Sequence, residues 1–186
     1  MKKHKYGMNY DEIVEGCKKD KREAQMKFYA LFSREVYVTA YRLLENSFDA
    51  EEVMQESLLK VLMNKDLLLP QRSNMLMRIK RIAINASVDV LRRRSNTVLW
   101  NDSIDAEEDE NFEDVLMREE RMRLLHKAIE ALPTGYRAVV LMYIVEELDY
   151  KEISQILNVT ASAVRSQLTR AKRRITEWFE NYENGR

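Results

Sequence analysis

Residues 150–169, YKEISQILNVTASAVRSQLT, contain two short helical patterns separated by a turn. Apolar residues recur at helical spacing on both sides of that turn: Ile153, Leu157, Val159, Val164 and Leu168. Residues spaced by three and four share one face of a helix, so these five can hold two helices together at a steep angle. The pattern predicts helices at about 150–157 and 161–180, with the turn between them.

The polar residues in and around the turn fit the same geometry. Asn158 stands where the chain must adopt a left-handed backbone conformation, which Asn tolerates better than most residues. Thr160 follows as the predicted N-cap of the second helix. Ser154 is small at the point where the second helix should pass close to the first. Residues 150–169 are therefore predicted to form a helix-turn-helix.

The second helix carries the side chains expected to contact DNA. Its outward N-terminal face is predicted to consist of Ala161, Ser162, Arg165 and Ser166. Arg165 is the side chain among them that can form two hydrogen bonds to one guanine in the major groove. The basic residues that follow, before the first acid at Glu177, suit phosphate contact: Arg170, Lys172, Arg173 and Arg174. A solvated helix pair within a bundle is the alternative, but the turn, cap and charge together favour DNA binding.

The whole composition indicates an all-α protein. Its 186 residues include 4 Gly and 2 Pro, so residues that form turns are scarce, and strong helix formers dominate. The single Cys17 fits a reducing compartment, and the sequence has no apolar run near the about 18 residues that span a bilayer. The basic start at Met1–Lys5 leads into polar residues rather than an apolar signal core, which predicts a cytoplasmic protein.

Helical periodicity predicts the element order. Helices are expected at about 9–18, 21–45, 49–64, 72–93, 113–131, 134–145, 150–157 and 161–180. Asp49 is the expected N-cap of the third helix, with Glu52 completing a capping box. The predicted apolar stripe of that helix is Ala50, Val53, Met54, Leu58, Val61 and Leu62. The stripe predicted for helix 72–93 is Leu76, Ile79, Ala83, Ala86, Val90 and Leu91.

A net charge of zero hides a strongly uneven distribution of charge. Residues 99–120 hold ten acidic side chains and one basic one, whereas the rest of the chain is basic. A block of like charges with little apolar periodicity predicts a linker at 99–116. The expected domains are residues 1–98 and 117–186, two small helical domains joined by this acidic linker. From the residues alone, the linker is interpreted as a plain tether.

Three further blocks place the chain beside a known family. These blocks are FDAEEVMQESLLKVL at 48–62, IKRIAINASVDVLRRR at 79–94 and ALPTGYRAVVL at 131–141. In this order, and followed by the helix-turn-helix, they resemble the extracytoplasmic-function branch of the sigma-70 family. The resemblance covers about residues 25–180. It implies a sigma-2-like domain, a sigma-4-like domain, and a role in transcription initiation without catalysis, metal or cofactor. It also implies that the acidic linker could mimic nucleic-acid charge in a basic channel, and the plain tether stays open as the alternative.

The resemblance assigns three sets of candidate residues. Those implied to bind core RNA polymerase are Asp49, Glu52, Gln55 and Glu56. Those implied for the promoter −10 element are Arg78, Lys80, Arg81, Asn85, Arg92, Arg93 and Arg94. Those implied for the −35 element are Ala161, Ser162, Arg165, Ser166, Arg170, Lys172 and Arg173. From the residues alone, the first set is more readily explained as the solvated side of its helix. The second set could be a solvated basic face with some charge pairing, and Asp89 could be either a family position or a structural partner for an arginine.

Two departures from the family pattern limit the detail. Met75-Leu76 stands where an aromatic residue followed by Leu is frequent, and Ser162-Ala163-Val164 replaces a frequent Gly-Thr-Val. The implied partners are core RNA polymerase, promoter DNA and an anti-sigma factor, with no lipid or small-molecule substrate.

Two other classes of function compete with the sigma factor. A stand-alone helix-turn-helix regulator explains the C-terminal part but leaves residues 1–98 without a role. An enzyme acting on nucleic acid is disfavoured, because His4 and His126 are far apart in the sequence, Cys17 is isolated and no glycine-rich phosphate loop is present.

Overall fold

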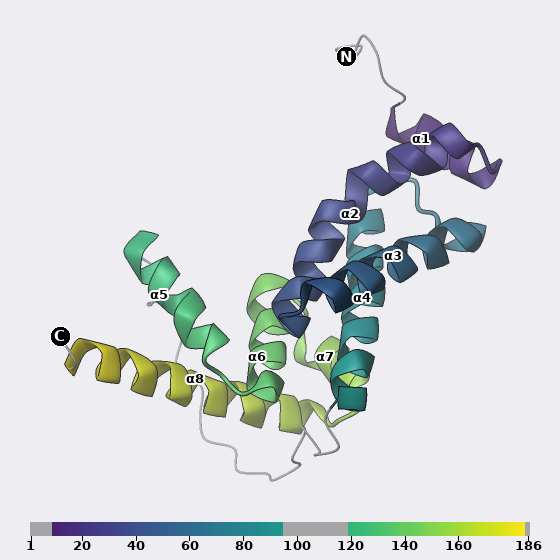
Figure 1. Ribbon diagram of the computed structural model, residues 1–186. Helices are drawn as coiled ribbons and strands as arrows, with labels where there is room; N and C mark the ends of the chain where they lie inside the picture. The colour runs from purple at the N-terminus through teal and green to yellow at the C-terminus, as the bar shows by residue number, and fades with distance from the viewer. Residues whose placement is uncertain (1–8, 95–118, 185–186) are drawn as a thin grey trace. The chain divides into compact units, whose positions relative to one another are not determined.

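The computed structural model describes residues 9–94 and 119–184, apart from the side chains of residues 119–122 and 183 (Figure 1). Every regular element in these ranges is helical, which confirms the all-α prediction. The chain divides into two compact units, Met1–Arg94 and Ser95–Arg186. None of the described helices is long and apolar enough to cross a membrane. The predicted acidic linker at 99–116 lies outside the described residues.

Within residues 9–94, the first unit contains four helices, α1 (Tyr10–Lys18), α2 (Arg22–Leu44), α3 (Ser47–Met63) and α4 (Arg72–Arg94). The long α2 packs against each of the others, and α3 also packs against α4. Phe28 and Phe32 of α2 are fully buried, with their ring centroids 4.8 Å apart in an edge-to-face arrangement. The order of the four helices matches the one that the sequence predicted. A 3-10 turn at Lys65–Leu67, which the sequence did not predict, lies between α3 and α4.

The predicted cap of α3 is wrong by three residues. Asn46, not Asp49, is the N-cap, and its Oδ1 accepts a hydrogen bond from the backbone N–H of Asp49 at 3.1 Å. The helix therefore begins at Ser47, with Asp49 inside its first turn. Asn and Asp are equally good caps, so the sequence alone did not separate the two positions. The shift leaves the Asp49 carboxylate available for another partner.

The apolar stripe of α4 is also displaced from its predicted position. Ile79, Ala83 and Leu91 are buried as expected, but Leu76, Ala86 and Val90 are only half-buried. The residues buried in their place are Met75, Ile84, Ser87 and Val88. Because α4 packs against both α2 and α3, its buried face is wider than one amphipathic stripe and turns toward both neighbours. On α3 the prediction holds, except that Leu62 is half-buried and Ser57 is buried.

Ser87 offers a test of this packing. Its side chain is fully buried, and its hydroxyl has no hydrogen-bond partner among the residues that the structure describes. Removing an unsatisfied buried hydroxyl lowers the desolvation cost of folding, so Ser87→Ala should stabilise the protein by about 1 kcal/mol. Urea unfolding followed by circular dichroism measures the change, with the exposed Ser73→Ala as the matched control. A loss of stability in Ser87→Ala would show that the hydroxyl is bonded in solution.

Cys17 is the second testable feature of this unit. The thiol is fully buried in α1, and burial, followed by the nearby Asp20 carboxylate, raises its pKa to about 11. The folded state therefore holds the thiol proton more tightly than the unfolded state. The stabilisation that this provides is complete below pH 9 and is lost as the pH rises from 9 to 11. A buried neutral thiol is a poor nucleophile.

Cys17 should consequently resist modification in the native protein. At pH 8, Ellman's reagent is expected to react at least about 100-fold more slowly with the folded chain than with the chain in urea. Absorbance at 412 nm follows the reaction. Equal rates in the two states would contradict the buried position of the thiol.

The second unit is built around α8 (Ala161–Asn184), which packs against α5 (Glu119–Glu130), α6 (Thr134–Val140) and α7 (Tyr150–Leu157). The helix predicted at 134–145 ends instead in a π turn at Leu141–Val145, and the last helix runs to Asn184 rather than 180. Residues 113–118 of the helix predicted at 113–131 lie outside the described range. Among the described residues of this unit, the largest fully buried side chains are Met142, Ile153 and Leu157.

Candidate polymerase and DNA interfaces

The turn between α7 and α8 has the geometry that the sequence predicted. Asn158 has φ 52° and ψ 49°, the left-handed conformation expected at that position. Thr160 caps α8, since its Oγ1 accepts a hydrogen bond from the backbone N–H of Ala163 at 3.1 Å. Asp149 and Glu152 add a capping box at the start of α7 that the prediction missed. These contacts fix both helix ends that a helix-turn-helix presents to DNA.

The apolar contacts of the motif largely follow the prediction. Ile153, Leu157 and Val164 are buried, whereas Val159 and Leu168 are half-buried. Ala163 and Ala171 are buried as well, although the sequence did not single them out. Their small side chains suit an α8 that is in contact with three other helices.

The outward face of α8 differs from the prediction at one position. Ala161, Ser162 and Arg165 are exposed, as expected. Ser166, however, is 4% exposed and lies in the interior, so it is withdrawn from the candidate −35 residues. Because α8 packs against three helices, its buried surface includes Ser166 and Gln167. The exposed guanidinium of Arg165 is the main group left for contact with base edges.

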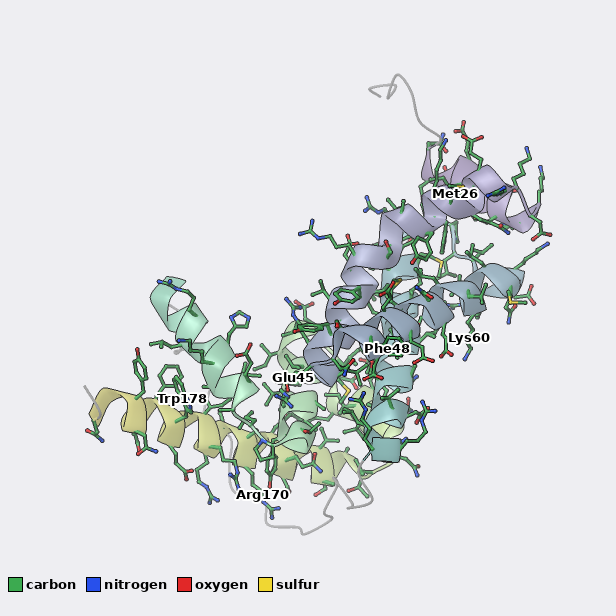
Figure 2. All side chains as sticks on the ribbon, in the orientation of Figure 1. Met26, Glu45, Phe48, Lys60, Arg170 and Trp178 are labelled. Atoms are coloured by element: carbon green, nitrogen blue, oxygen red, sulfur yellow. The ribbon has the colours of Figure 1, made fainter. Side chains whose placement is uncertain are left out.

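The basic residues beyond Arg165 do not form one uniform cluster. The guanidinium carbon of Arg174 lies 5.4 Å from the ring centroid of Tyr136 in α6, and Arg173 pairs with Glu177 at 3.5 Å. Arg170 and Lys172 are half-buried, and Figure 2 labels Arg170 on α8. Arg174 is thus directed toward α6, whereas Arg173 remains exposed beside a carboxylate that competes with phosphate.

On α3, three of the four predicted polymerase-binding residues are exposed. Glu52, Gln55 and Glu56 face solvent, and the Gln55 amide donates to the Glu51 carboxylate at 3.2 Å. Asp49 differs, because its side chain is only 17% exposed and forms an ion pair with Arg94 at the end of α4. Asp49 therefore joins two helices of this unit instead of extending the exposed acidic face.

Sequence reasoning missed the apolar part of the α3 face. Phe48 and Met63 are each 76% exposed, and Leu59 is 55% exposed. Steps of three and four residues put them on one side of the helix with Glu52 and Glu56. Large apolar side chains in an exposed row are typical of a surface that binds another protein. Their spacing was visible in the sequence, but which of the apolar residues of α3 would remain exposed was not. Figure 2 shows Phe48 near the start of α3 and Lys60 further along it.

The seven candidate −10 residues fall on two sides of α4. At 100° per residue, Arg78, Arg81, Asn85 and Arg92 share one face, whereas Lys80 and Arg94 lie roughly opposite. Arg81 and Asn85 are exposed, and Arg78 and Arg92 are half-buried. We name these four residues the α4 basic face. Arg93 is exposed beside this face, and Arg94 is held by Asp49.

Asp89 pairs with the arginines that follow it. Its carboxylate lies 3.1 Å from the Arg92 guanidinium, and its backbone carbonyl accepts a hydrogen bond from Arg93 Nε at 3.4 Å. This geometry supports the structural alternative for Asp89 that the sequence left open. The carboxylate also lowers the net charge at this end of the α4 basic face.

Two family models of known proteins match this chain, one for each of its two compact units. The family model described as Sigma-70 region 2 matches residues 28–97, and that described as Sigma-70, region 4 matches residues 122–175. The chain is 29% identical over 154 residues to the ECF RNA polymerase sigma factor SigE of Mycolicibacterium smegmatis, covering 80% of this chain and 59% of that protein. It is 24% identical over 170 residues to SigW of Bacillus subtilis, covering 86% and 90%.

Solved structures are also similar to this chain, and the following is one of them. The sigma factor RpoE of Bartonella quintana, in complex with the anti-sigma factor NepR, is 20% identical with a TM-score of 0.49, covering 88% of this chain and 98% of that one. The two family models match, in order, the two compact units described above, and together with the relatives they identify the chain. It belongs to the sigma-70 family, in the branch of the extracytoplasmic-function sigma factors.

Proposed function

We infer that the chain acts as an RNA polymerase sigma factor of the extracytoplasmic-function type, which binds core polymerase and directs promoter recognition, DNA opening and transcription initiation. The observation that carries this inference is the pairing, in family order, of an exposed acidic and apolar helix face in one unit with a complete helix-turn-helix in the other. A stand-alone regulator needs only the second of these.

The polymerase contact is assigned to α3. Glu52, Gln55 and Glu56 supply charge and hydrogen-bonding groups, and Phe48, Leu59 and Met63 supply the apolar area that a stable interface buries. Asp49 is left out, because its carboxylate is already engaged with Arg94.

The α4 basic face and α8 are assigned to DNA. On α4, the guanidinium groups of Arg78, Arg81 and Arg92 offer charge for the displaced single strand, and Asn85 offers both a donor and an acceptor to an unstacked base. On α8, Arg165 contacts bases of the −35 element from the major groove, while Arg170, Lys172 and Arg173 contact phosphates. Binding energy opens the duplex, and the nucleotide chemistry stays with polymerase.

The domain limits 1–98 and 117–186, the tethering role of residues 99–116, a cytoplasmic location and control by an anti-sigma factor belong to this proposal. A cytoplasmic location is expected because the partner, RNA polymerase, is found there. An anti-sigma factor would act by covering the α3 face or the DNA-binding residues of α8.

Reconstitution tests the proposed function. The purified chain, mixed with core polymerase from a bacterium with a related sigma factor, should elute as a stoichiometric complex from a gel-filtration column. That complex should then transcribe members of a promoter library with a randomised upstream region, whereas core polymerase alone should not. Failure of both complex formation and transcription would exclude the sigma factor. Binding of the isolated chain to a palindromic duplex as a dimer would favour the stand-alone regulator.

A further inference from the structure

A column of three side chains stands beside the outward face of the helix-turn-helix. The guanidinium carbon of Arg165 lies 5.6 Å from the ring centroid of Tyr150. The ring of Tyr150 is in turn stacked on that of Tyr143, with centroids 5.2 Å apart and planes inclined by 16°. The three side chains come from α8, from the first residue of α7 and from the π turn Leu141–Val145.

Backbone and capping hydrogen bonds fix the positions of both tyrosines. Tyr150 follows the N-cap Asp149, whose capping box with Glu152 fixes the start of α7. Tyr143 lies in the π turn, which is closed by the hydrogen bond from the Glu146 backbone N–H to the Leu141 carbonyl at 3.1 Å. A π turn inserts one extra residue into a helix and changes the direction of the side chains there, and such turns are common at functional sites.

A cation–π contact with Tyr150 is compatible with hydrogen bonding by Arg165 to a base. A guanidinium stacks on an aromatic ring through its flat face, whereas its five N–H donors lie in its own plane. A guanine in the major groove offers O6 and N7 to two of those in-plane donors. A long arginine side chain otherwise has many rotamers, and contact with the Tyr150 ring restricts them before DNA arrives.

We propose that Tyr150, backed by Tyr143, is a positioning residue for base recognition, which holds the Arg165 guanidinium ready for a guanine of the −35 element. This inference rests on the proposed function, because it assigns a specificity device to the helix-turn-helix of a sigma factor. Tyr150 acts through Arg165 and does not itself contact the base.

The test uses holoenzyme reconstituted from core polymerase and the full-length chain. The probe is a promoter library with a randomised −35 window, in which each transcript carries a barcode for its template. Comparing the wild type with Arg165→Ala identifies the base pair whose preference depends on Arg165. The variants Tyr150→Leu, Tyr150→Phe and Tyr143→Leu are then measured on the same library, each with a thermal unfolding curve.

Tyr150→Leu should lower the guanine preference at that base pair about fivefold, since the cation–π contact is lost. Tyr150→Phe keeps the ring and should keep the preference, and Tyr143→Leu should show an intermediate loss. In an Arg165→Ala background, Tyr150→Leu should have no further effect at that base pair. The matched control is Tyr136→Leu, which removes the ring beneath Arg174 and should leave the guanine preference unchanged.

The outcomes separate the two claims. If the wild-type holoenzyme transcribes the library but Tyr150→Leu keeps the full preference, or lowers it equally without Arg165, the positioning role is wrong and the sigma factor stands. If the wild type directs no transcription at all, the proposed function fails and the positioning role fails with it.

Discussion

Glu56→Lys should weaken binding of the chain to core polymerase by at least about 30-fold, equivalent to about 2 kcal/mol. Glu56 is exposed near the middle of α3 and shares its side with Glu52 and the exposed Leu59 and Met63. A lysine there places a like charge against any basic surface that the acidic face binds, and its charge must also be desolvated inside the interface. Fluorescence anisotropy of the labelled full-length chain, titrated with core polymerase, measures the change.

The control is Asp66→Lys, which makes the same charge change at an exposed position in the 3-10 turn after α3. It should alter the affinity by less than about twofold, because a surface charge away from an interface has little effect on binding. Leu59→Ala and Met63→Ala test the apolar part of the face and should each weaken binding several-fold. Equal affinities for Glu56→Lys and Asp66→Lys would remove α3 as the polymerase-binding surface.

The element order of the fold was predictable because apolar residues recur at helical spacing along the chain. The misplaced cap of α3 and the displaced stripe of α4 share a different cause, which is tertiary packing. Asn46 and Asp49 have equal cap propensity, and only the packed structure chooses between them. Met75 and Ser87 are buried because α4 has two neighbours, a fact that a single-helix pattern does not contain.

In the candidate sites, too, features set by local sequence were predicted and features set by tertiary packing were not. The turn at Asn158 and the cap at Thr160 depend on local chemistry, and the sequence predicted both correctly. The burial of Ser166 and the pairing of Asp49 with Arg94 depend on neighbours distant in the sequence, and the prediction missed both. A resemblance to a family places a residue in a motif, but it does not say whether that residue faces inward or is already engaged.

The second large effect concerns the phosphate contacts of α8. Arg170→Ala combined with Arg173→Ala should reduce the slope of log affinity against log salt by about 2, since each lost phosphate contact contributes about 0.9. At 0.15 M salt this amounts to roughly 30-fold weaker binding. The contribution of phosphate contacts to affinity does not depend on base sequence, so any duplex of about 30 base pairs serves as the probe. Fluorescence anisotropy with the full-length chain, between 50 and 300 mM salt, measures the affinity.

The matched control removes two positive charges elsewhere in the same unit, with Arg123→Ala and Lys127→Ala on the exposed side of α5. A general effect of net charge would lower the affinity for DNA equally in both double variants. Phosphate contact by α8 predicts a smaller salt slope only in the variant that lacks Arg170 and Arg173. Glu177→Gln should have the opposite effect on the affinity for DNA. Its carboxylate pairs with Arg173 at 3.5 Å, so neutralising it should release that guanidinium and strengthen DNA binding. If the two double variants have the same slope, α8 does not contact the phosphates through Arg170 and Arg173.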